Sequence, residues 1–425
     1  MNDFDDKMEE NDEELSEETE LSETEETEQT VEEDKEADIE ENTEADTVED
    51  GEDVLQEETE TKVKKHRFSK KLRVLIGVDI TLVSLWLIVF LTILIGKKVI
   101  TNRFIDKLNY ETFDGYHIDE NAIKESADET VPDEDNLDEV ERNLIDADSK
   151  TFFYSTEAVE SNYVTNILFI GTDVRVSDSW NGNSDSMILV SINKKTKKIV
   201  MTSFMRDMYV YIPELDTSGK LNLSHAVGGS NLLCATITGN FKIKVDKYLR
   251  VDFYGMMNIV DAAGGIDMYV TDEEIPVAND YIRRMCQYTG QDPNTQYLTT
   301  GGDLHLNGMQ AVAYARIRYV GNADYERTNR QRKILNAIFN NCKSMSMTQI
   351  MNFADNALPN ISTNMESDEI WDIIEDAITY LGYEVVSQRV PFDDSSTPTY
   401  IDNISVLLPD YKKNVELLIN GIYGE

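Results

Sequence analysis

The feature that most constrains this chain is an almost purely apolar stretch over residues 74–96, in which Asp79 is the single charged residue. In a helix, about 23 residues at about 1.5 Å each reach about 34 Å, which exceeds the roughly 30 Å hydrocarbon core of a bilayer. The stretch therefore predicts a membrane-spanning helix. A cleaved signal peptide is the competing interpretation, but the apolar run is too long, begins too far into the chain, and has no small-residue cleavage site after it.

The charges on the two sides of this stretch predict its orientation. Seven Lys and Arg residues lie within residues 62–73, whereas only Lys97, Lys98 and Arg103 follow closely after it. Because the cytoplasmic flank of a span carries the excess of positive charge, we expect the N-terminus in the cytoplasm. The sequence thus predicts a single-pass protein of the cell membrane, with the whole C-terminal part outside the cell.

The N-terminal segment carries most of the formal net charge of -43. Residues 1–61 contain about 31 Asp and Glu against two Lys, with hardly any aromatic residue. Such a segment cannot bury enough apolar surface to offset its chain entropy, so we predict a disordered cytoplasmic tail of unknown partner. Residues 62–98 then form the basic juxtamembrane segment and the span. Residues 99–160 are acidic again and are interpreted as an extracellular stalk.

The cysteine pattern excludes two classes of small domain. Cys234, Cys286 and Cys342 are odd in number and widely spaced, so at most one disulfide can form and no disulfide framework is expected. Their spacing does not match a metal site. With only four His in the chain, a Cys–His nucleophilic site is not expected either.

The remainder, residues 161–425, alternates short apolar runs with helical patterns, which predicts one α/β domain. Extended runs are expected at 166–170, 187–192, 198–204, 246–251 and 266–270, with a hairpin joining the second and third. Helices are expected at 226–241, 254–263, 307–315, 324–339, 368–381 and 412–422. Residues 272–300 show no clear period and are interpreted as a surface excursion.

Charged residues stand at the ends of the first three predicted strands. Asp173 follows one strand, Asp185 precedes the next, and the pair Arg206-Asp207 follows the third. A single rim of the sheet could therefore gather these four side chains.

The segment over residues 307–333 concentrates arginine in an otherwise acidic protein. Asn307 is a suitable N-cap for a short helix, and residues 316–319 are interpreted as extended, which would place Arg316 and Arg318 on one side. Arginine is suited to anion binding because its planar fork meets phosphate or carboxylate oxygens two at a time. A solvated basic helix face is the alternative.

The following helix supplies more of these groups on one face. Asp324, Arg327 and Gln331 recur at helical spacing, with Arg330 beside them, near the N-terminal end where the helix dipole also favours an anion. Arg332 falls off that face. The segment therefore predicts one wall of an anion site, and the strand ends predict the other.

Seven blocks of the sequence, in order, resemble the LytR-CpsA-Psr family of cell-wall glycopolymer transferases. They are NILFIGTD (166–173), NSDSMILVSIN (183–193), SFMRDMYVYIP (203–213), KLNLSHAVGG (220–229), VDFYGMMNIVDAAGGID (251–267), HLNGMQAVAYARIRY (305–319) and DYERTNRQRKIL (324–335). The resemblance implies a LytR-CpsA-Psr-type domain with a central mixed sheet flanked by helices. Asn183 and Glu326 depart from the family pattern, at positions where an Arg and a Gly are common.

The resemblance also implies a reaction. Members move a glycopolymer, such as a teichoic-acid-like or capsular polysaccharide, from a polyprenyl pyrophosphate carrier to peptidoglycan through a phosphodiester. By resemblance, Asp173 and Asp185 would hold Mg²⁺. The expected pyrophosphate ligands are Arg206, Arg316, Arg318, Arg327, Arg330 and Gln331. Asp207 or Asp324 could act as a general base, although either could equally anchor an arginine.

Three other functions compete with this Mg²⁺-dependent ligase. A non-catalytic membrane regulator or scaffold could sense lipid-linked wall precursors without transferring them, and a lipid pyrophosphatase would use water as the acceptor. Nucleic-acid binding fits poorly, because the domain is acidic and has no broad basic surface. The complete set of carboxylates and arginines favours catalysis.

Overall fold

The computed structural model describes residues 97–116, 118–119, 136–173, 182–318, 320–321 and 323–424. The predicted acidic tail and the apolar stretch of residues 74–96 lie outside these ranges. None of the helices within them combines the length and the apolar composition that a membrane crossing requires.

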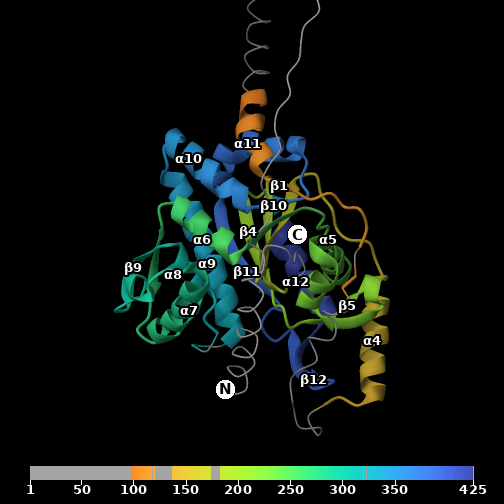
Figure 1. The fold of residues 1–425 in the computed structure, drawn as a ribbon. Coiled ribbons are helices and arrows are strands. Elements are labelled where there is room, and N and C mark those ends of the chain that lie inside the picture. Colours follow the sequence, from red (N-terminus) through yellow and green to blue (C-terminus); the bar gives the residue numbers. More distant parts are fainter. Residues whose placement is uncertain are drawn as a thin grey trace, which may run out of the picture. The chain divides into compact units, whose positions relative to one another are not determined.

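A seven-stranded mixed sheet forms the centre of the domain, in the order β1-β10-β7-β2-β3-β4-β11 (Figure 1). Its strands are β1 (Asn109–Tyr110), β2 (Val164–Thr172), β3 (Ser184–Asn193), β4 (Lys198–Phe204), β7 (Tyr248–Asp252), β10 (Ser362–Thr363) and β11 (Glu384–Val390). β2, β3 and β4 pair antiparallel, while β7 runs parallel to β2 and β11 parallel to β4. The predicted α/β class with a central mixed sheet is confirmed.

The predicted hairpin between β3 and β4 is also confirmed. The side-chain oxygen of Asn193 accepts hydrogen bonds from the backbone N–H groups of Lys195 and Thr196, each at 2.9 Å. Lys197 then adopts a left-handed conformation, with φ of 56°. An Asn side chain that bonds to the backbone two residues further on favours such a turn.

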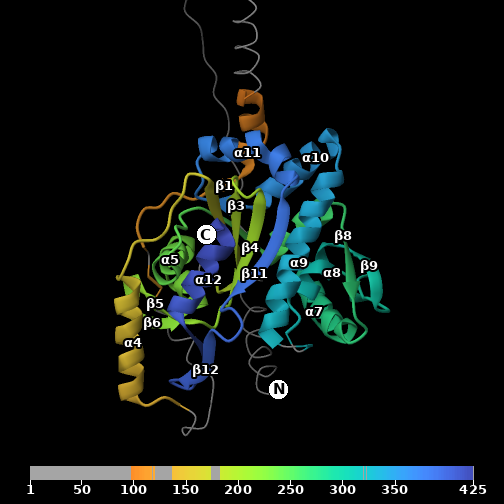
Figure 2. The same ribbon diagram turned by 180° about the vertical axis from the view of Figure 1, so that it is seen from behind.

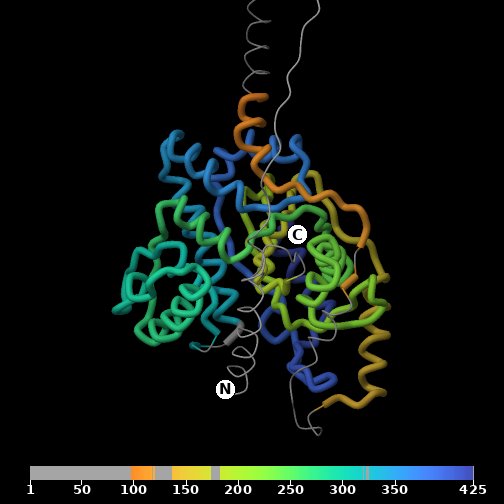
Figure 3. Tube along the Cα trace, in the orientation of Figure 1, coloured from red at the N-terminus to blue at the C-terminus, as the bar shows by residue number. Residues whose placement is uncertain are grey.

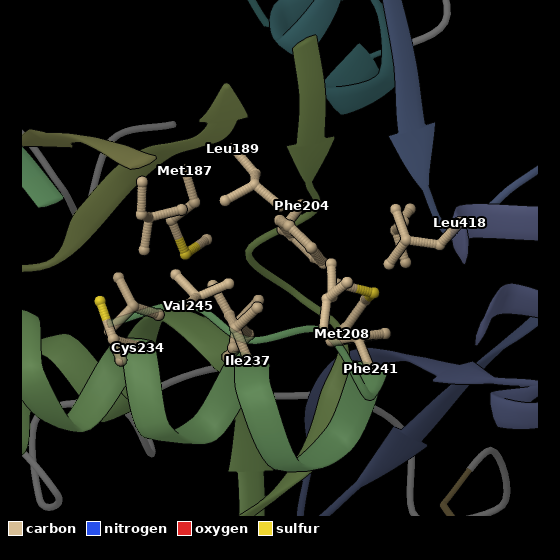
Figure 4. Packing of buried hydrophobic residues seen from close by; sticks show 14 of the residues in the cluster. Met187, Leu189, Phe204, Met208, Cys234, Ile237, Phe241, Val245 and Leu418 are labelled. Carbon is tan, nitrogen blue, oxygen red and sulfur yellow. The ribbon is translucent and has the colours of Figure 1, made fainter. Parts of the chain in front are cut away.

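One face of the sheet is covered by α5 (Leu221–Phe241) and α12 (Tyr411–Tyr423). Their apolar side chains meet those of β2, β3 and β4 in the largest core cluster of the described residues. In Figure 4, Met187 and Leu189 of β3 point toward Ile237 and Cys234 of α5. Since β3 is buried on both faces, its residues form a continuous apolar run rather than an alternating one.

The opposite face is covered by α9 (Ala323–Ser344) and α11 (Ser367–Leu381), with α10 (Met347–Ala357) beside them. Figure 2 shows α9 running alongside β4 and β11. Leu335 and Phe339 of α9 pack against Ile188 and Met201 of the sheet. The two faces of the sheet are thus both covered by helices.

A second core lies beside the sheet and is built from α6 (Phe253–Ala262), α7 (Glu274–Thr289), α8 (Gly308–Ala315) and the hairpin of β8 (Ile266–Val270) and β9 (Gly302–Leu306). α7 corrects the prediction of an irregular excursion at residues 272–300. Its buried face carries Ile275, Ala278 and Ile282 at helical spacing. The remaining residues of α7 are mostly polar or charged, which hides this narrow apolar stripe in the sequence.

The boundary predicted at residue 161 is corrected by the structure. β1 pairs with β10 in the main sheet, and α4 (Glu139–Phe153) packs on the hairpin of β5 (Tyr209–Ile212) and β6 (Thr217–Lys220). In Figure 3, the orange N-terminal segment passes among the blue C-terminal segments. The described parts of the expected stalk therefore belong to the folded domain.

The described domain is completed by one more hairpin and several short turns. The hairpin joins β12 (Ser396–Ile401) and β13 (Ile404–Pro409), and the 3-10 turns are η1 (Ile105–Lys107), η3 (Pro213–Leu215), η4 (Pro293–Thr295) and η5 (Leu358–Asn360).

Candidate functional site

The C-terminal ends of β2, β4 and β11 and the beginning of β3 meet at one edge of the sheet. Thr172 pairs with Ser184, and Phe204 pairs with Val390. Asp173, Asp185 and Arg206 lie at or just beyond these ends. The shared rim predicted from the positions of the charges is therefore present in the fold.

Three arginines converge on one carboxylate oxygen at this rim. Oδ1 of Asp185 accepts from Nη1 of Arg206 at 2.8 Å, from Nη2 of Arg318 at 3.3 Å and from Nη1 of Arg327 at 3.3 Å. The three donors come from the end of β4, from the segment after α8, and from the first turns of α9. We name Asp185, Arg206, Arg318 and Arg327 the arginine cluster, in which three guanidinium groups share one carboxylate oxygen.

The environment of Asp185 keeps it ionised. Burial alone would raise the pKa of its carboxyl group, but the charges of Arg327, Arg206 and Arg318 outweigh this effect and hold the pKa below its usual value. Arg327 is itself 2% exposed. A buried guanidinium loses little of its field to solvent, so a ligand at the rim would interact strongly with Arg327.

The segment after α8 brings Arg318 to the cluster. α8 begins at a capping box, in which the Asn307 side chain accepts from Gln310 N–H and Gln310 reaches back to Asn307 N–H. This confirms the predicted N-cap. The predicted extended run at residues 316–319 is wrong within its described part, because Arg316 is the helical C-cap of α8, with φ of −90° and ψ of −8°.

That difference separates the two arginines that were expected on one side. The guanidinium carbon of Arg316 lies 4.2 Å from the ring centre of Phe253 and 5.1 Å from that of Tyr281. Cation–π stacking of this kind holds the side chain over the α6–α7 side. Arg318, two residues further on, turns toward Asp185 instead.

Gln331 lies next to the arginine cluster, one turn beyond Arg327 on α9. Its Nε2 donates to the backbone oxygen of Asp185 at 3.4 Å. The predicted common face of Arg327 and Gln331 is confirmed. Asp324 belongs to the first turn of α9, but its side chain lies outside the described part of the structure.

Arg330 does not join the cluster, although its spacing suggested that it would. Its Nε donates to Oε1 of Glu274 at 2.7 Å, and its Nη groups donate to the backbone oxygens of Ile317 and Val320 at 3.1 and 3.0 Å. Both charged side chains are buried, with 3% of Arg330 and 6% of Glu274 exposed. This pair positions the segment that carries Arg318 and is not itself open to a ligand.

Asp207 is held between two cations. Its Oδ2 lies 3.5 Å from Nε of Arg206, and its Oδ1 lies 3.1 Å from Nζ of Lys220. Of the two roles left open for Asp207, this geometry favours the anchor of an arginine over a general base. Lys220 is a neighbour of the site that sequence reasoning missed; it lies in a block shared with the family, which is the only signal that pointed to it.

Of the two carboxylates expected to hold a metal, Asp173 directly follows β2 and Asp185 lies near the start of the adjacent strand β3. Asp173 N–H donates to the backbone oxygen of Asn183 at 3.3 Å, which ties the end of β2 to the start of β3. Within the described residues, no cluster of three or more His, Cys, Asp or Glu could hold a metal ion. Mg²⁺ often needs only one or two carboxylates when phosphate oxygens and water complete its shell, so Asp173 and Asp185 supply the type of ligand that such an ion takes.

Comparison with known proteins agrees with this arrangement. The model of the LytR_cpsA_psr family matches residues 121–420. The chain belongs to the LytR-CpsA-Psr family. The predicted family is thereby confirmed, and with it the central mixed sheet flanked by helices.

Individual relatives within the LytR-CpsA-Psr family are distant. Biofilm regulatory protein A of Streptococcus mutans is 33% identical over 212 residues, which cover 47% of this chain and 50% of that protein. The polyisoprenyl-teichoic acid–peptidoglycan teichoic acid transferase TagV of Bacillus subtilis is 33% identical over 208 residues, or 48% and 50% of the two chains. The chain thus spans about half the length of the curated relatives it matches.

A solved structure is similar in fold. The crystal structure of protein gbs0355 from Streptococcus agalactiae has a TM-score of 0.51 and 25% sequence identity, and the match covers 64% of this chain and 90% of that one.

Proposed function

We propose that this protein is a membrane-anchored phosphotransferase that moves a glycopolymer from a polyprenyl pyrophosphate carrier to peptidoglycan. The single observation that carries the proposal is the convergence of Arg206, Arg318 and Arg327 on Asp185. Guanidinium groups bind phosphate oxygens two at a time, which suits a pyrophosphate diester with its two negative charges. The name of the Bacillus subtilis relative, a polyisoprenyl-teichoic acid–peptidoglycan teichoic acid transferase, describes the same chemistry.

In the proposed reaction, a hydroxyl group of peptidoglycan attacks the phosphorus that carries the glycan. The new P–O bond forms as the bond to the bridging oxygen breaks, and the polyprenyl phosphate leaves with the electron pair. The arginines of the cluster neutralise the charge that moves onto the leaving phosphate. Such preorganised donors typically account for about 10²- to 10³-fold of the rate each. The proton of the hydroxyl passes to a base, for which Asp324 is the candidate left after Asp207.

Mg²⁺ dependence belongs to the same proposal. Asp173 and Asp185 would hold the ion, which when bound would withdraw charge from the phosphate oxygens. Oδ1 of Asp185 already accepts from three arginines, whereas no donor of the described residues contacts its Oδ2. The hydrogen bonds to Oδ1 would orient this carboxylate and leave Oδ2 for the ion.

The membrane anchor and the extracellular position rest on the apolar stretch and its flanking charges. A polyprenyl carrier resides in the bilayer, so an enzyme that acts on it benefits from a membrane anchor of its own.

The test uses the full chain in detergent or liposomes, supplied with Mg²⁺, a polyprenyl-pyrophosphate glycan and peptidoglycan fragments. We expect Arg318→Ala and Asp173→Ala to lower glycan transfer and polyprenyl phosphate release by at least 10²-fold. Arg283→Ala is a matched control, because Arg283 lies exposed on α7 and pairs only with Asp280 among the described residues.

The outcomes separate the competing functions. Transfer and release at the parent level in both variants would show that the assigned site is wrong. Release without transfer would indicate a lipid pyrophosphatase, and lipid binding without either product would indicate a regulator or sensor.

A further inference from the structure

Arg332 is a buried cation that forms no ion pair with any described residue. The residue is 8% exposed, and its Nη1 donates to the hydroxyl group of Ser203 at 2.6 Å. Among the described residues, its Nε has no hydrogen-bond partner. Within the described ranges, no carboxylate oxygen lies within 4.0 Å of its guanidinium nitrogens, in contrast to Arg327 and Arg330.

The surroundings of Arg332 do not favour its charge. Burial is the main reason that the pKa of Arg332 falls to about 10, the positive charge of Arg389 adds to this effect, and Glu326 opposes it. The guanidinium nevertheless stays protonated near neutral pH. A buried charge without an ion pair destabilises the folded state, so the folded structure alone does not explain why this position carries a cation. Binding of an anion would remove this destabilisation.

Arg389 supplies a second cation at the same place. It pairs across the sheet with Ser203 in the parallel ladder of β11 and β4, so both side chains lie on the face covered by α9. Its guanidinium carbon lies 4.3 Å from the ring centre of Tyr325, and it pairs with Asp393, whose side chain is 87% exposed. An ion pair with such an exposed carboxylate contributes little and is readily exchanged for another anion.

The position of these residues connects them to the arginine cluster. Ser203 is three residues before Arg206 on the same chain segment, and Arg332 follows Gln331 directly on α9. β11 is the neighbour of β4, on the side away from β3. Strands are about 4.8 Å apart, so Arg389 lies roughly two strand spacings from the strand of Asp185.

We propose that Arg332, Arg389 and Ser203 form a second anion subsite beside the arginine cluster, which takes a further phosphate or carboxylate group of the lipid-linked polymer. The inference rests on the proposed function and deepens it, because it assigns the protein to polymers that carry negative charge near the pyrophosphate. The Ser203 hydroxyl and the two guanidinium groups would donate to the oxygens of this group.

The experiment measures substrate preference in the full chain. Three polyprenyl-pyrophosphate glycans are compared: one neutral, one with a glycerol phosphate unit and one with a uronic acid. We expect Arg332→Gln to lower the preference for the anionic over the neutral glycan, measured as a ratio of kcat/KM, by about tenfold, the usual scale for one hydrogen bond to a charged group. Arg389→Gln tests the subsite independently at a more exposed residue, and Arg283→Gln is the control.

The two anionic glycans distinguish phosphate from carboxylate as the bound group. An equal loss on all three substrates would show that Arg332 acts only through the fold and would overturn the subsite. Unchanged preference in both Arg332→Gln and Arg389→Gln would overturn it as well.

A second measurement does not depend on the proposed reaction. Calorimetric titration measures the affinity of the protein for inorganic pyrophosphate and for tripolyphosphate. Pyrophosphate would occupy the arginine cluster alone, whereas the third phosphate of tripolyphosphate would extend toward the proposed subsite. In Arg332→Gln, the Kd for tripolyphosphate should rise by a factor about tenfold larger than the factor by which the Kd for pyrophosphate rises. If the parent transfers no glycan but shows this difference, the proposed function fails while the subsite stands; if the two ligands weaken equally, the subsite fails.

Discussion

At the scale of single residues, arginine side chains of the same segment have different roles, which depend on the groups around each of them. Arg318 and Arg327 reach the carboxylate of Asp185, Arg330 holds a backbone segment, and Arg316 stacks on Phe253. All four looked equivalent in the sequence. Each task depends on the one or two groups within hydrogen-bond or stacking distance, and those groups come from other parts of the chain.

His225 shows how burial determines a single residue. It is fully buried in α5, where its Nδ1 lies 2.7 Å from the backbone oxygen of Gly182 and its Nε2 lies 3.4 Å from the Ser230 hydroxyl. The carbonyl can only accept, so Nδ1 carries the proton. Burial lowers the pKa of His225 to about 4. The residue ties the chain just before Asp185 to α5 and does not line the rim.

We therefore expect the stability of the protein to fall as the pH drops from about 6.5 toward about 4. The folded pKa of about 4 lies below the unfolded value of about 6.5, so the unfolded chain takes up the proton first. The loss should approach about 3 kcal/mol over this range, on the scale of 1.36 kcal/mol for each pKa unit. Urea unfolding of the parent and of His225→Gln at several pH values measures it, and the variant should show a flatter curve.

His305→Gln is the matched control for this prediction. His305 is exposed, and its hydrogen bond to Asp267 raises its pKa. Its contribution to stability is therefore present at low pH and is lost as the pH rises, which is the opposite sign. Parallel curves for the parent and His225→Gln between pH 7 and 4.5 would contradict the assignment.

At the scale of secondary-structure elements, the site depends on how α7, α8 and α9 are fastened together. Glu274 of α7 also accepts from Thr271 N–H at 2.8 Å, so one carboxylate fixes the turn before its own helix and binds Arg330 of α9. Arg330 in turn holds the backbone after α8. The three elements thus share a single buried ion pair, which we regard as a positioning device for Arg318.

Glu274→Gln should destabilise the protein by about 3–5 kcal/mol, because it leaves the buried Arg330 without its counterion. We expect the double variant Glu274→Gln/Arg330→Gln to recover part of this loss, as a double-mutant cycle of chemical unfolding would measure. Glu273→Gln, one residue away and exposed, is the control. In the folded fraction of Glu274→Gln, KM for the lipid substrate should rise more than kcat falls. Additive single losses would argue against a coupled pair.

At the scale of the whole described domain, the segment after residue 97 is part of the fold rather than a spacer. Glu111 accepts from the Tyr248 hydroxyl at 2.6 Å and pairs with Arg250. Trp371 Nε1 donates to Thr101 Oγ1 at 2.9 Å, and Asp355 binds both Arg103 and Lys107. These contacts join the beginning of the domain to elements far along the chain.

A chain that starts at residue 161 should therefore melt at a temperature several degrees lower than one that starts at residue 97, or should lack a cooperative transition. Removal of the earlier segment exposes the edge of β10 and leaves Arg250 and Trp371 without their partners. Circular dichroism melting of the two chains measures the difference. Equal melting temperatures would support the domain boundary at residue 161 that was predicted from composition.

The sequence by itself determined the family, the α/β class, most helices and strands, and the rim that gathers Asp185 and Arg206. These properties follow from local periodicity, from capping residues and from charges at the ends of strands, all of which are readable along the chain. The narrow stripe of α7 and the folded role of residues 97–116 were missed, because polar composition conceals elements whose burial comes from distant partners.

Only the tertiary structure decided which arginines share a carboxylate and which do not. Spacing along a helix gives the direction of a side chain but not its partner. Arg330 meets Glu274, Arg316 meets Phe253, and Arg332 meets Ser203. These partners come from separate elements, and no local pattern in the sequence indicates the contacts. Electrostatic and stacking energies depend on distances of a few ångströms across the fold. The local pattern therefore predicted an anion site, and tertiary packing selected its members.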